Sequence, residues 1–538
     1  MGPKLAAKIP PVNTSFQSFL NDQTNEFLTL KPTTVEELNG ICMSMKSGKA
    51  PGYDDISMYV IKNTFELVSE SLKNIINLSF SKGIFPDKLK VAKVIPVFKA
   101  DEPDLFTNYR PISLLPNFSK FFEKVMHNRL VEFANSNDIF YQLQFGFRKN
   151  HSTALSLIYL VNKIATSIDQ NEITAGVFLD LSKAFDTLDH QILFHKLEHY
   201  GVCGPALQWI KSYFSNRNQF VQINDTRSSE QIIRCGVPQG SILGPLFFIL
   251  YINDLPKTTR LAECLLFADD TSIFYSNSDP EHVASVMNSE LTKISLWMKS
   301  NKLSVNIKKT NYVIFKPKQK SVQMNSKISL DSIALKQETE VKFLGIYIDE
   351  CLTWKSHISY ISKKISKSIG IMYRFRFFLS SNTKLSLYYT LIYPYLTYCT
   401  TVWSATYVTN LNRIFLLQKR AVRAMTNSNH LAPSAPLFAQ LNILDIFKVN
   451  SLYIAKFMFS YHHRLLPTPF LNLFMTSGQI HNYDTRTSAH FRPHTCRTNI
   501  KQFTILFRGP KIWNALPLTI TSSPSLITFK RKLLDFLS

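Results

Sequence analysis

The chain has 538 residues, 13% of them aromatic, so it can bury large cores and is not a disordered polypeptide. Its 61 Lys and Arg residues outnumber its 38 Asp and Glu residues, which gives a formal net charge of +23. Because acidic surfaces serve solubility at least as well as basic ones, an excess this large favours a polyanionic partner such as nucleic acid.

The cysteines and the apolar runs bear on where the protein works. The seven cysteines are scattered and form no Cys-x-x-Cys pair, which argues against a disulfide framework. The amino terminus has no apolar signal core. The longest apolar runs, such as 242–252, are too short to cross a bilayer and contain Gly244 and Pro245. We therefore expect a soluble intracellular protein with no membrane partner.

The sequence pattern in the first third of the chain predicts several helices and one strand. Thr34 followed by two glutamates predicts a helix start. Residues 91–99 are typical of a strand and end in Lys99, and the segment 108–114, Asn-Tyr-Arg-Pro-Ile-Ser-Leu, carries Arg110. Taken alone, both cations would be solvated surface charges. Further helices are expected at 57–82, 121–133 and 153–168.

The next apolar run ends at an acidic residue. Residues 176–179 predict a strand, and Asp180 stands at its C-terminal end. The following residues, Leu-Ser-Lys-Ala-Phe-Asp-Thr-Leu-Asp-His, lead into a helix that we expect to begin near Asp189. A helix cap explains Asp186 or Asp189 better than it explains Asp180.

A glycine-rich loop follows at 236–246, Gly-Val-Pro-Gln-Gly-Ser-Ile-Leu-Gly-Pro-Leu, and opens an apolar helix. It contains Gln239 and Gly240. The Gly-Lys-Ser/Thr ending of a Walker loop is absent. Taken alone, the segment would be a turn before a core helix.

Two adjacent carboxylates, Asp269 and Asp270, lie between apolar runs within 264–275, at the predicted bend of a hairpin. Neighbouring carboxylates repel each other, so a fold keeps such a pair only where it is solvated or neutralised by a cation. An isolated Asp-Asp pair is most often an exposed turn.

The order of these elements changes that interpretation. A strand-end Asp, a Gly-Pro-Gln-Gly type of loop and a Phe-Ala-Asp-Asp hairpin together resemble the palm of a reverse transcriptase. The amino-acid sequences of 108–114, 180–186 and 267–270 are similar to the corresponding motifs of LINE-type non-LTR retrotransposons of the Jockey-like branch. The resemblance also includes the next palm motif at 297–310 and the primer-grip hairpin at 341–349.

The resemblance implies an α/β (α+β) fold, built as a right-hand polymerase with fingers, palm and thumb, plus a basic C-terminal extension. The position and charge of the basic residues in the expected thumb suit contact with a template–primer duplex; they are Lys363, Lys364, Lys367, Arg374, Arg376, Lys419, Arg420 and Arg423. The expected regions are a flexible lead-in at 1–29, fingers and an N-terminal extension at 30–170, the catalytic palm with part of the fingers inserted at 171–350, a helical thumb at 351–430 and a basic region of unknown role at 431–538.

Elements of this kind normally carry an endonuclease before the polymerase, and here only about thirty residues precede the expected fingers. We expect a fragment, a truncated copy, or a product that uses nicks made elsewhere. The implied activity is RNA-directed DNA polymerisation, with an RNA template, a DNA primer or target DNA and dNTPs as partners. Target-primed insertion would place the protein in the nucleus.

The resemblance also assigns the site residues. Two Mg²⁺ ions, or Mn²⁺ in their place, are expected at Asp180 and Asp269, with Asp270 more peripheral, because Mg²⁺ prefers hard oxygen ligands. The implied nucleotide-binding residues are Lys99, Arg110, Phe185, Gln239, Gly240 and Lys309, and the implied primer grip is Phe343, Leu344 and Gly345.

The roles of these residues follow from their chemistry. Lys99 and Arg110 would hold the triphosphate. Phe185 would lie beneath the sugar and exclude a 2′-hydroxyl, with plain core packing as the alternative. Lys309 would protonate or neutralise the pyrophosphate, a role that its neighbour Lys308 could also fill.

Two other functions compete with this one. The first is an inactive nucleic-acid-binding relic, against which the presence of all three palm acids argues. The second is an RNA-dependent RNA polymerase, against which Phe185 and the Phe-Ala-Asp-Asp hairpin argue.

Overall fold

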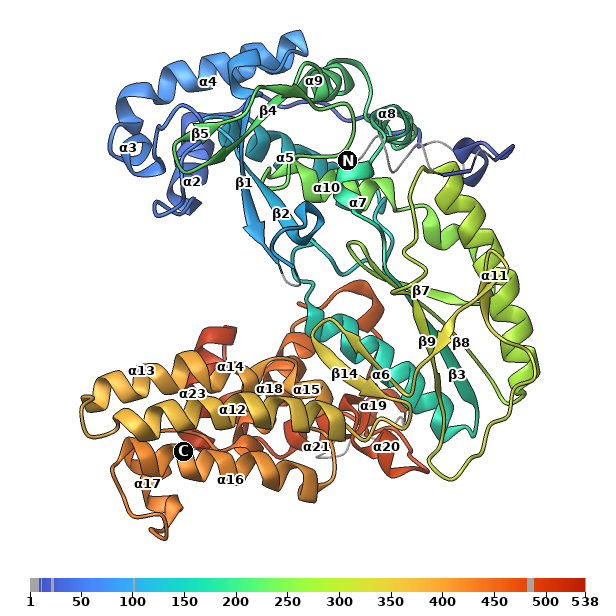
Figure 1. The fold of residues 1–538 in the computed structure, drawn as a ribbon. Helices are drawn as coiled ribbons and strands as arrows, with labels where there is room; N and C mark the ends of the chain where they lie inside the picture. Colours follow the sequence, from blue (N-terminus) through green and yellow to red (C-terminus); the bar gives the residue numbers. More distant parts are fainter. Residues whose placement is uncertain (1–8, 11, 21–23, 100–101, 481–487, 538) are drawn as a thin grey trace. The chain divides into compact units, whose positions relative to one another are not determined.

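The structure is a computed structural model that describes residues 9–10, 12–20, 24–99, 102–480 and 488–537 (Figure 1). The chain forms two compact units, each assembled from separate stretches of sequence. The first unit contains 1–147, 180–260 and 290–306, and the second contains 148–179, 261–289 and 307–538. Helices and mixed sheets occur in both, as expected for an α/β (α+β) protein.

The first unit is built on a sheet in the order β2-β1-β4-β5, with β6 also paired to β4. Strand β1 pairs antiparallel with β2 and parallel with β4. The strands are β1 (Ala92–Phe98), β2 (Tyr109–Leu114), β4 (Asn218–Ile223), β5 (Thr226–Arg227) and β6 (Gln231–Ile232). The helices are α2 (Val35–Ser44), α3 (Met58–Asn63), α4 (Phe65–Lys82), α5 (Ser119–Ser136), α7 (Ala184–Thr187), α8 (His190–His199), α9 (Gly204–Phe214), α10 (Leu243–Tyr251) and the second half of α11 (Pro280–Ser300).

A buried ion pair joins three helical segments of this unit. The ammonium of Lys196 on α8 lies 2.6 Å from Oδ1 of Asp254 and donates to the carbonyl of Tyr251 at 2.7 Å. The indole of Trp297 on α11 donates to the other oxygen of Asp254 at 3.1 Å. Both charges are almost fully shielded from solvent. Because each is paired and hydrogen-bonded, burial does not leave an uncompensated charge, and the pair links these helical segments.

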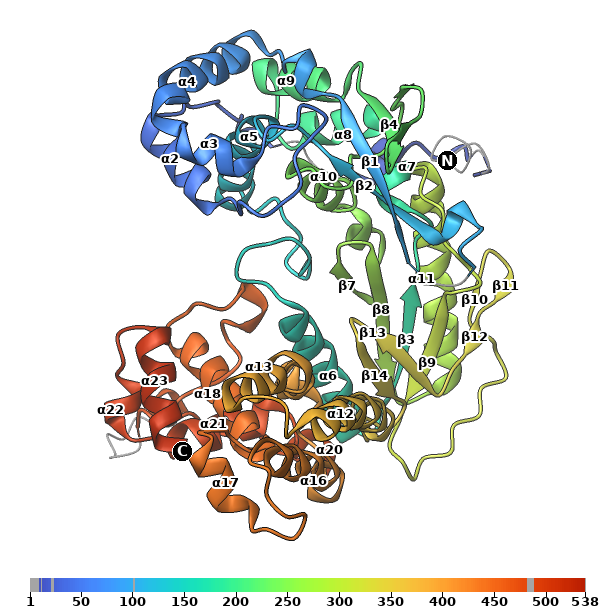
Figure 2. The same ribbon diagram turned by 60° about the vertical axis from the view of Figure 1, so that its left-hand side comes forward.

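The second unit contains a sheet in the order β12-β9-β3-β8-β7 (Figure 2). Strand β3 (Ile173–Leu179) lies between β8 and β9 and is antiparallel to both, and all its residues are buried. Helix α6 (Thr153–Asp169) packs against β3, β7 and β8. The other strands are β7 (Glu263–Phe267), β8 (Asp270–Asn277), β9 (Asn311–Phe315), β10 (Ser329–Leu330), β11 (Ile333–Ala334), β12 (Lys336–Gln337), β13 (Glu340–Phe343) and β14 (Ile346–Asp349).

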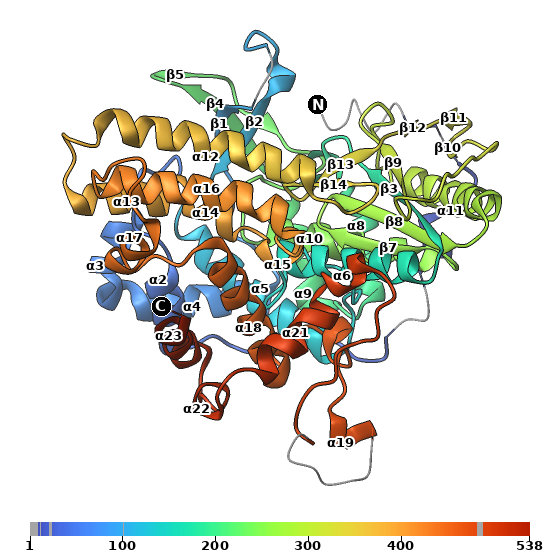
Figure 3. The ribbon, with the colours of Figure 1, turned by 90° about the horizontal axis from the view of Figure 1, so that it is seen from below.

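The rest of the second unit is helical (Figure 3). Helix α12 packs along α16, and α18 packs against α21 and α23. The helices are α12 (Lys355–Phe375), α13 (Ser381–Leu391), α14 (Tyr393–Thr397), α15 (Thr400–Trp403), α16 (Val408–Met425), α17 (Ser434–Gln440), α18 (Ile446–His462), α19 (Ser477–Ile480), α20 (Asn499–Gln502), α21 (Ile505–Asn514), α22 (Leu518–Thr521) and α23 (Leu526–Leu537).

The C-terminal region is held against α6 at Asp169, the last residue of that helix. The Asp169 carboxylate accepts hydrogen bonds from the backbone N–H groups of Arg497 and Thr498 at 2.8 and 2.7 Å. It also accepts the Thr498 hydroxyl at 2.9 Å and lies 3.4 Å from the Lys501 ammonium. Burial alone would raise the pKa of Asp169, but the hydrogen bonds from Thr498 outweigh this effect and lower the pKa. This region is therefore a packed part of the second unit.

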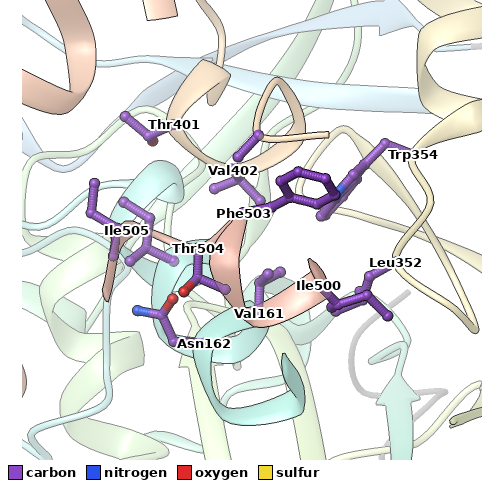
Figure 4. A pocket seen from close by; sticks show the side chains of 12 residues that line it. Val161, Asn162, Leu352, Trp354, Thr401, Val402, Ile500, Phe503, Thr504 and Ile505 are labelled. Atoms are coloured by element: carbon purple, nitrogen blue, oxygen red, sulfur yellow. The ribbon is translucent and has the colours of Figure 1, made fainter. Parts of the chain in front are cut away.

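A small cavity lies where α6, α15 and the C-terminal region meet (Figure 4). Its volume is about 20 Å³, and apolar side chains such as Val161, Trp354 and Phe503 form most of its wall. That volume has room for about one water molecule. The cavity is a packing defect at this junction, too small for a nucleotide.

Several expected elements are confirmed. Thr34 caps α2, with its hydroxyl accepting the N–H of Glu37, and β3 ends at Leu179, directly before Asp180. The helix expected at 57–82 is interrupted at Thr64, whose backbone leaves helical geometry between α3 and α4. No helix in the described part of the chain is both long enough and apolar enough to cross a membrane.

Candidate active site

The acidic hairpin is a tight turn. Phe267 of β7 pairs with Asp270 of β8, so Ala268 and Asp269 alone form the loop. Ala268 has a φ of 56°, and Asp269 does not share this left-handed geometry. A two-residue hairpin with positive φ only at its first position normally has glycine there. The alanine therefore carries backbone strain, which is typical of residues held in place at functional sites.

The register of the sheet relates this turn to the strand that precedes Asp180. Leu179, the last residue of β3, is the partner of Thr271, the residue after Asp270. Asp180 follows Leu179 by one peptide bond and falls in the first unit, whereas Asp269 and Asp270 fall in the second. The C-terminal end of β3 and the start of β8 therefore lie side by side, at the same end of these two interior strands.

Asp180 is held by a neighbouring segment of the first unit. The Asn306 side chain donates to Oδ2 of Asp180 at 3.1 Å, and the Asn306 backbone N–H donates to the Asp180 carbonyl at 2.8 Å. Leu181 forms a β-bridge with Val305. The segment at 304–306 thus fixes the orientation of the Asp180 carboxylate. Asn306 lies within the palm motif 297–310, but sequence reasoning gave it no role.

The donor set suits Mg²⁺, because carboxylate oxygens are the hard ligands that this ion prefers. Asp269 is half-buried and Asp270 is exposed, so a hydrated ion can reach them. Within the described ranges, no three His, Cys, Asp or Glu side chains are grouped as metal ligands. The assignment of Asp180, Asp269 and Asp270 to two metal ions stays a prediction.

The two predicted phosphate-binding cations share one face of the β1–β2 hairpin. Arg110 pairs with Val97, and the Lys99 N–H donates to the Asn108 carbonyl at 2.9 Å, which continues the same register. Because side chains alternate along a strand, Lys99 projects to the same face as Val97 and therefore as Arg110. Both cations are exposed. This arrangement suits a phosphate chain that spans the two side chains.

The glycine-rich loop packs onto β2. The Ser113 N–H donates to the Gln239 carbonyl at 2.7 Å. Gly240 has a φ of 134°, and a Cβ atom there would lie 2.4 Å from the Ser113 carbonyl oxygen. Only glycine allows this close approach of two backbones. Gln239 and Gly240 are therefore fixed relative to the strand that carries Arg110.

The helix after this loop begins on a buried carboxylate. Glu123 of α5 accepts the backbone N–H groups of Ile242 and Leu243 at 2.7 and 3.3 Å and the Ser119 hydroxyl at 2.8 Å. Burial raises the pKa of Glu123. The carboxyl group stabilises the N-terminus of α10 and anchors the end of the loop. Nothing in the sequence distinguished Glu123 from a solvated charge on an amphipathic helix.

Asp186 and Asp189 have different roles. Asp189 caps α8 by accepting the N–H groups of Gln191 and Ile192, which confirms that a cap explains an acid at this position. Asp186 instead accepts a hydrogen bond from the Gln239 side chain at 2.8 Å. Burial raises the pKa of the Asp186 carboxyl. Sequence reasoning missed this link because it joins two segments that are distant in the chain.

Phe185 lies half-buried between two aromatic rings. Its ring centroid is 4.6 Å from that of Phe248 and 6.2 Å from that of Phe147, with the second pair edge to face. The residue is not fully buried, which is compatible with contact to a sugar. Whether the ring selects the sugar stays a prediction.

Lys308 and Lys309 occupy the turn before β9, and both are exposed. Because the two lysines have similar environments, the structure favours neither of them as the residue that acts on pyrophosphate. The assignment to Lys309 therefore rests on the resemblance alone.

The predicted primer grip is a second two-residue hairpin. Phe343 of β13 pairs with Ile346 of β14, and the loop residues Leu344 and Gly345 have φ values of 45° and 82°. A type I′ hairpin turn requires positive φ at both positions. The Tyr398 hydroxyl donates to the Leu344 carbonyl at 2.7 Å, so the residue that follows α14 holds the tip in place.

A buried histidine supports the same hairpin and predicts a pH effect. His357 of α12 is 3% exposed, and its Nδ1 accepts the Tyr347 N–H at 3.5 Å. Burial lowers its pKa to about 4 from 6.5. Between these values the unfolded chain binds a proton that the folded chain does not, so stability falls as the pH drops from 6.5 towards 4.

We therefore expect His357→Gln, which keeps an acceptor but does not titrate, to flatten the pH dependence of unfolding in this window. The pH-dependent difference in free energy of unfolding between the variant and wild type should approach about 3 kcal/mol near pH 4, since each pKa unit is worth about 1.4 kcal/mol. Urea midpoints measured from neutral pH down to about pH 5 follow most of this change. Parallel pH profiles for the two proteins would contradict a neutral buried His357.

The comparisons with known proteins agree with this geometry. Residues 98–348 match the family described as Reverse transcriptase (RNA-dependent DNA polymerase). The chain is 30% identical, over 82% of its length and 50% of the relative, to the probable RNA-directed DNA polymerase from transposon BS of Drosophila melanogaster. It is 27% identical to the probable polymerase from transposon X-element of the same species, over 84% of this chain and 49% of the relative.

A third relative is the RNA-directed DNA polymerase from mobile element jockey of Drosophila melanogaster, which is 28% identical over 77% of this chain and 46% of the relative. The chain spans about half the length of these relatives. The matched residues 98–348 include all the predicted acidic, nucleotide-binding and primer-grip positions. The chain therefore belongs to the reverse transcriptases of LINE-type non-LTR retrotransposons.

Proposed function

We propose that the chain is an RNA-directed DNA polymerase that extends a DNA primer on an RNA template with dNTPs. The observation that carries the proposal is the strained Ala268–Asp269 turn, which presents Asp269 beside the end of the strand that runs into Asp180. Acidic residues at adjacent strand ends are what a nucleotidyl transfer site needs. The relatives' names support the same activity.

Asp180 and Asp269 would hold two Mg²⁺ ions, which supply activation of the primer 3′-oxygen and stabilisation of the leaving pyrophosphate. Lys99 and Arg110 bind the triphosphate, with the Arg110 guanidinium able to grip two phosphate oxygens. Phe185 supports the sugar from below. Lys309 neutralises or protonates the pyrophosphate as it leaves. Phe343, Leu344 and Gly345 position the primer end.

In this proposal the first unit contains most of the fingers, the adjoining ends of β3 and β8 belong to the palm, and α12 to α16 form the thumb. Residues 351–444 contain eleven Lys and Arg residues and no Asp or Glu. A groove of about 710 Å³ lies between α12 and α16. Its cationic lining consists of Lys363, Lys364, Lys367, Arg413 and Arg420. Such a groove is suited to a nucleic-acid backbone.

The groove predicts a salt-sensitive interaction. Each of Lys363→Gln and Lys367→Gln should weaken binding of an RNA–DNA duplex and reduce the slope of log K against log salt by about one, because one phosphate would no longer be neutralised. Fluorescence anisotropy at several salt concentrations measures the slope. Lys355→Gln is the matched control, because Lys355 is exposed on the same helix but does not line the groove. Equal slopes in the wild type and all three variants would rule out phosphate contacts in the groove.

Primer extension on poly(rA)/oligo(dT) tests the proposed activity. The purified chain should incorporate dTTP in the presence of Mg²⁺, and UTP far less, because Phe185 would exclude a 2′-hydroxyl. Efficient use of UTP alone would identify an RNA polymerase. A folded protein that binds the duplex but extends with neither nucleotide would be an inactive relic.

A further inference from the structure

The connection from α12 to α13 carries a group of aromatic rings that face solvent. Residues 373–378 are Tyr-Arg-Phe-Arg-Phe-Phe, and all four aromatic residues are exposed, with Phe377 at 69% and Phe378 at 85%. In Figure 1 and Figure 3 this connection lies at one extremity of the helical part of the second unit. Single exposed apolar residues are common, but a contiguous group of them marks a contact surface. We call residues 373–378 the aromatic cluster.

The aromatic cluster is ordered although it is exposed. The Phe378 N–H donates to the Phe375 carbonyl at 2.9 Å, which closes a turn at the end of α12. The guanidinium of Arg376 lies over two rings, 3.5 Å from the centroid of Tyr373 and 4.5 Å from that of Phe377. Because these contacts hold the rings before a ligand arrives, less conformational entropy is lost on binding.

The positive charge beside these rings is not neutralised. Arg374 and Arg376 form no ion pair with any residue that the structure describes. The Nη1 atom of Arg376 is shielded from solvent and has no hydrogen-bond acceptor among the described residues, so the rings and not an acceptor hold the guanidinium. Flat apolar rings next to free guanidinium groups suit a partner that has both planar rings and negative charges. Nucleic acid has both.

The aromatic cluster continues the cationic groove between α12 and α16. Lys363 and Lys367 line that groove, and Arg374 follows Lys367 by seven residues, or two helical turns, so the three cations share one face of α12. The rise of the helix places Arg374 about 10 Å beyond Lys367 along the axis. A nucleic-acid backbone that lies in the groove would therefore bring its next nucleotides to the rings. Paired bases are already stacked on one another, so exposed rings can stack only on unpaired ones.

We propose that the aromatic cluster is a stacking site for unpaired nucleotides of an RNA strand that extends beyond the template–primer duplex. The choice of RNA rests on the proposed polymerase function, whose template is RNA. The exposed rings accept the bases, and Arg374 and Arg376 contact the phosphates. Because every base has a flat face, the site binds without preference for sequence.

Two RNA–DNA duplexes of the same paired length test the proposal on the full chain. One is blunt, and the RNA strand of the other continues at both ends as unpaired uridines. The wild type should bind the extended duplex more tightly. Phe377→Leu and Phe378→Leu each remove a ring but keep an apolar side chain, and each should lower the ratio of the two affinities roughly fivefold or more, the worth of one base stacked on a ring. Phe377→Tyr keeps the ring and should keep the ratio.

Phe536→Leu is the matched control, because Phe536 is an exposed ring on α23 of the same unit, outside the aromatic cluster. It should leave the ratio unchanged. Melting temperatures should stay close to that of the wild type, since the replaced rings are exposed.

A wild-type ratio in both Phe377→Leu and Phe378→Leu would overturn the proposal, and so would equal binding of the two duplexes by the wild-type chain. If the leucine variants lose binding to phosphatidylserine vesicles while the ratio stays the same, the surface contacts membranes and not RNA. The binding assay needs no nucleotide addition. A chain that extends primers but shows an unchanged ratio therefore loses this inference alone, whereas a chain that extends no primer loses the polymerase function.

Discussion

Asp269→Asn is expected to abolish Mg²⁺-dependent primer extension while binding of the template–primer duplex survives. The substitution keeps the size of the side chain and suits the turn, but it removes a negative charge and replaces one oxygen with a donor. A metal ion contributes several kcal/mol to charge stabilisation in such a reaction. A loss of about 4 kcal/mol corresponds to roughly a 10³-fold slower extension.

Single-turnover extension and duplex anisotropy, measured on the same preparations, separate catalysis from binding. Asp331→Asn is the matched control, because Asp331 also lies in a two-residue hairpin turn of the second unit, between β10 and β11. Asp270→Asn should have a smaller effect than Asp269→Asn, since Asp270 is the more peripheral ligand. Wild-type extension by Asp269→Asn would refute the metal assignment of this residue.

Local features of the fold and of the candidate site could be predicted from the sequence, because patterns among neighbouring residues determine them. The end of β3 at Leu179 follows from an apolar run that stops at an acid, and the hairpin follows from two apolar runs around Asp269 and Asp270. The N-cap of α2 at Thr34 has the same basis, since its partner Glu37 belongs to the first turn of the same helix. Each of these signals involves neighbours within one or two turns of the chain.

The partners of buried polar groups could not be predicted, because they are chosen by tertiary packing. Glu123 has the composition of a surface charge, yet it is fully buried against the N-terminus of α10. Asp169 closes its helix and also holds Thr498, far along the chain. The parallel pairing of β1 with β4 joins strands between which the chain forms several helices and a strand of the second unit. No periodic pattern in the sequence indicates such contacts.

The last expectation concerns sugar choice, and it uses the position of Phe185 between Phe147 and Phe248. If the ring lies beneath C2′, Phe185→Val should open space there and raise ribonucleotide incorporation at least tenfold, because about 1.4 kcal/mol of lost steric penalty is already a factor of ten. Deoxynucleotide use should fall only modestly, since the exclusion is steric and the normal substrate has no group at that point.

The measurement is steady-state incorporation of UTP and dTTP by wild type and Phe185→Val on one template. Valine keeps part of the contact with Phe248, so the cavity costs less stability than alanine would. Phe194→Leu is the matched control: Phe194 is a buried ring of the same unit that contacts His190 and Phe214, and its loss should reduce stability without changing the UTP to dTTP ratio. An unchanged ratio in a folded Phe185→Val would make Phe185 a packing residue. Sugar selection would then have to come from another residue.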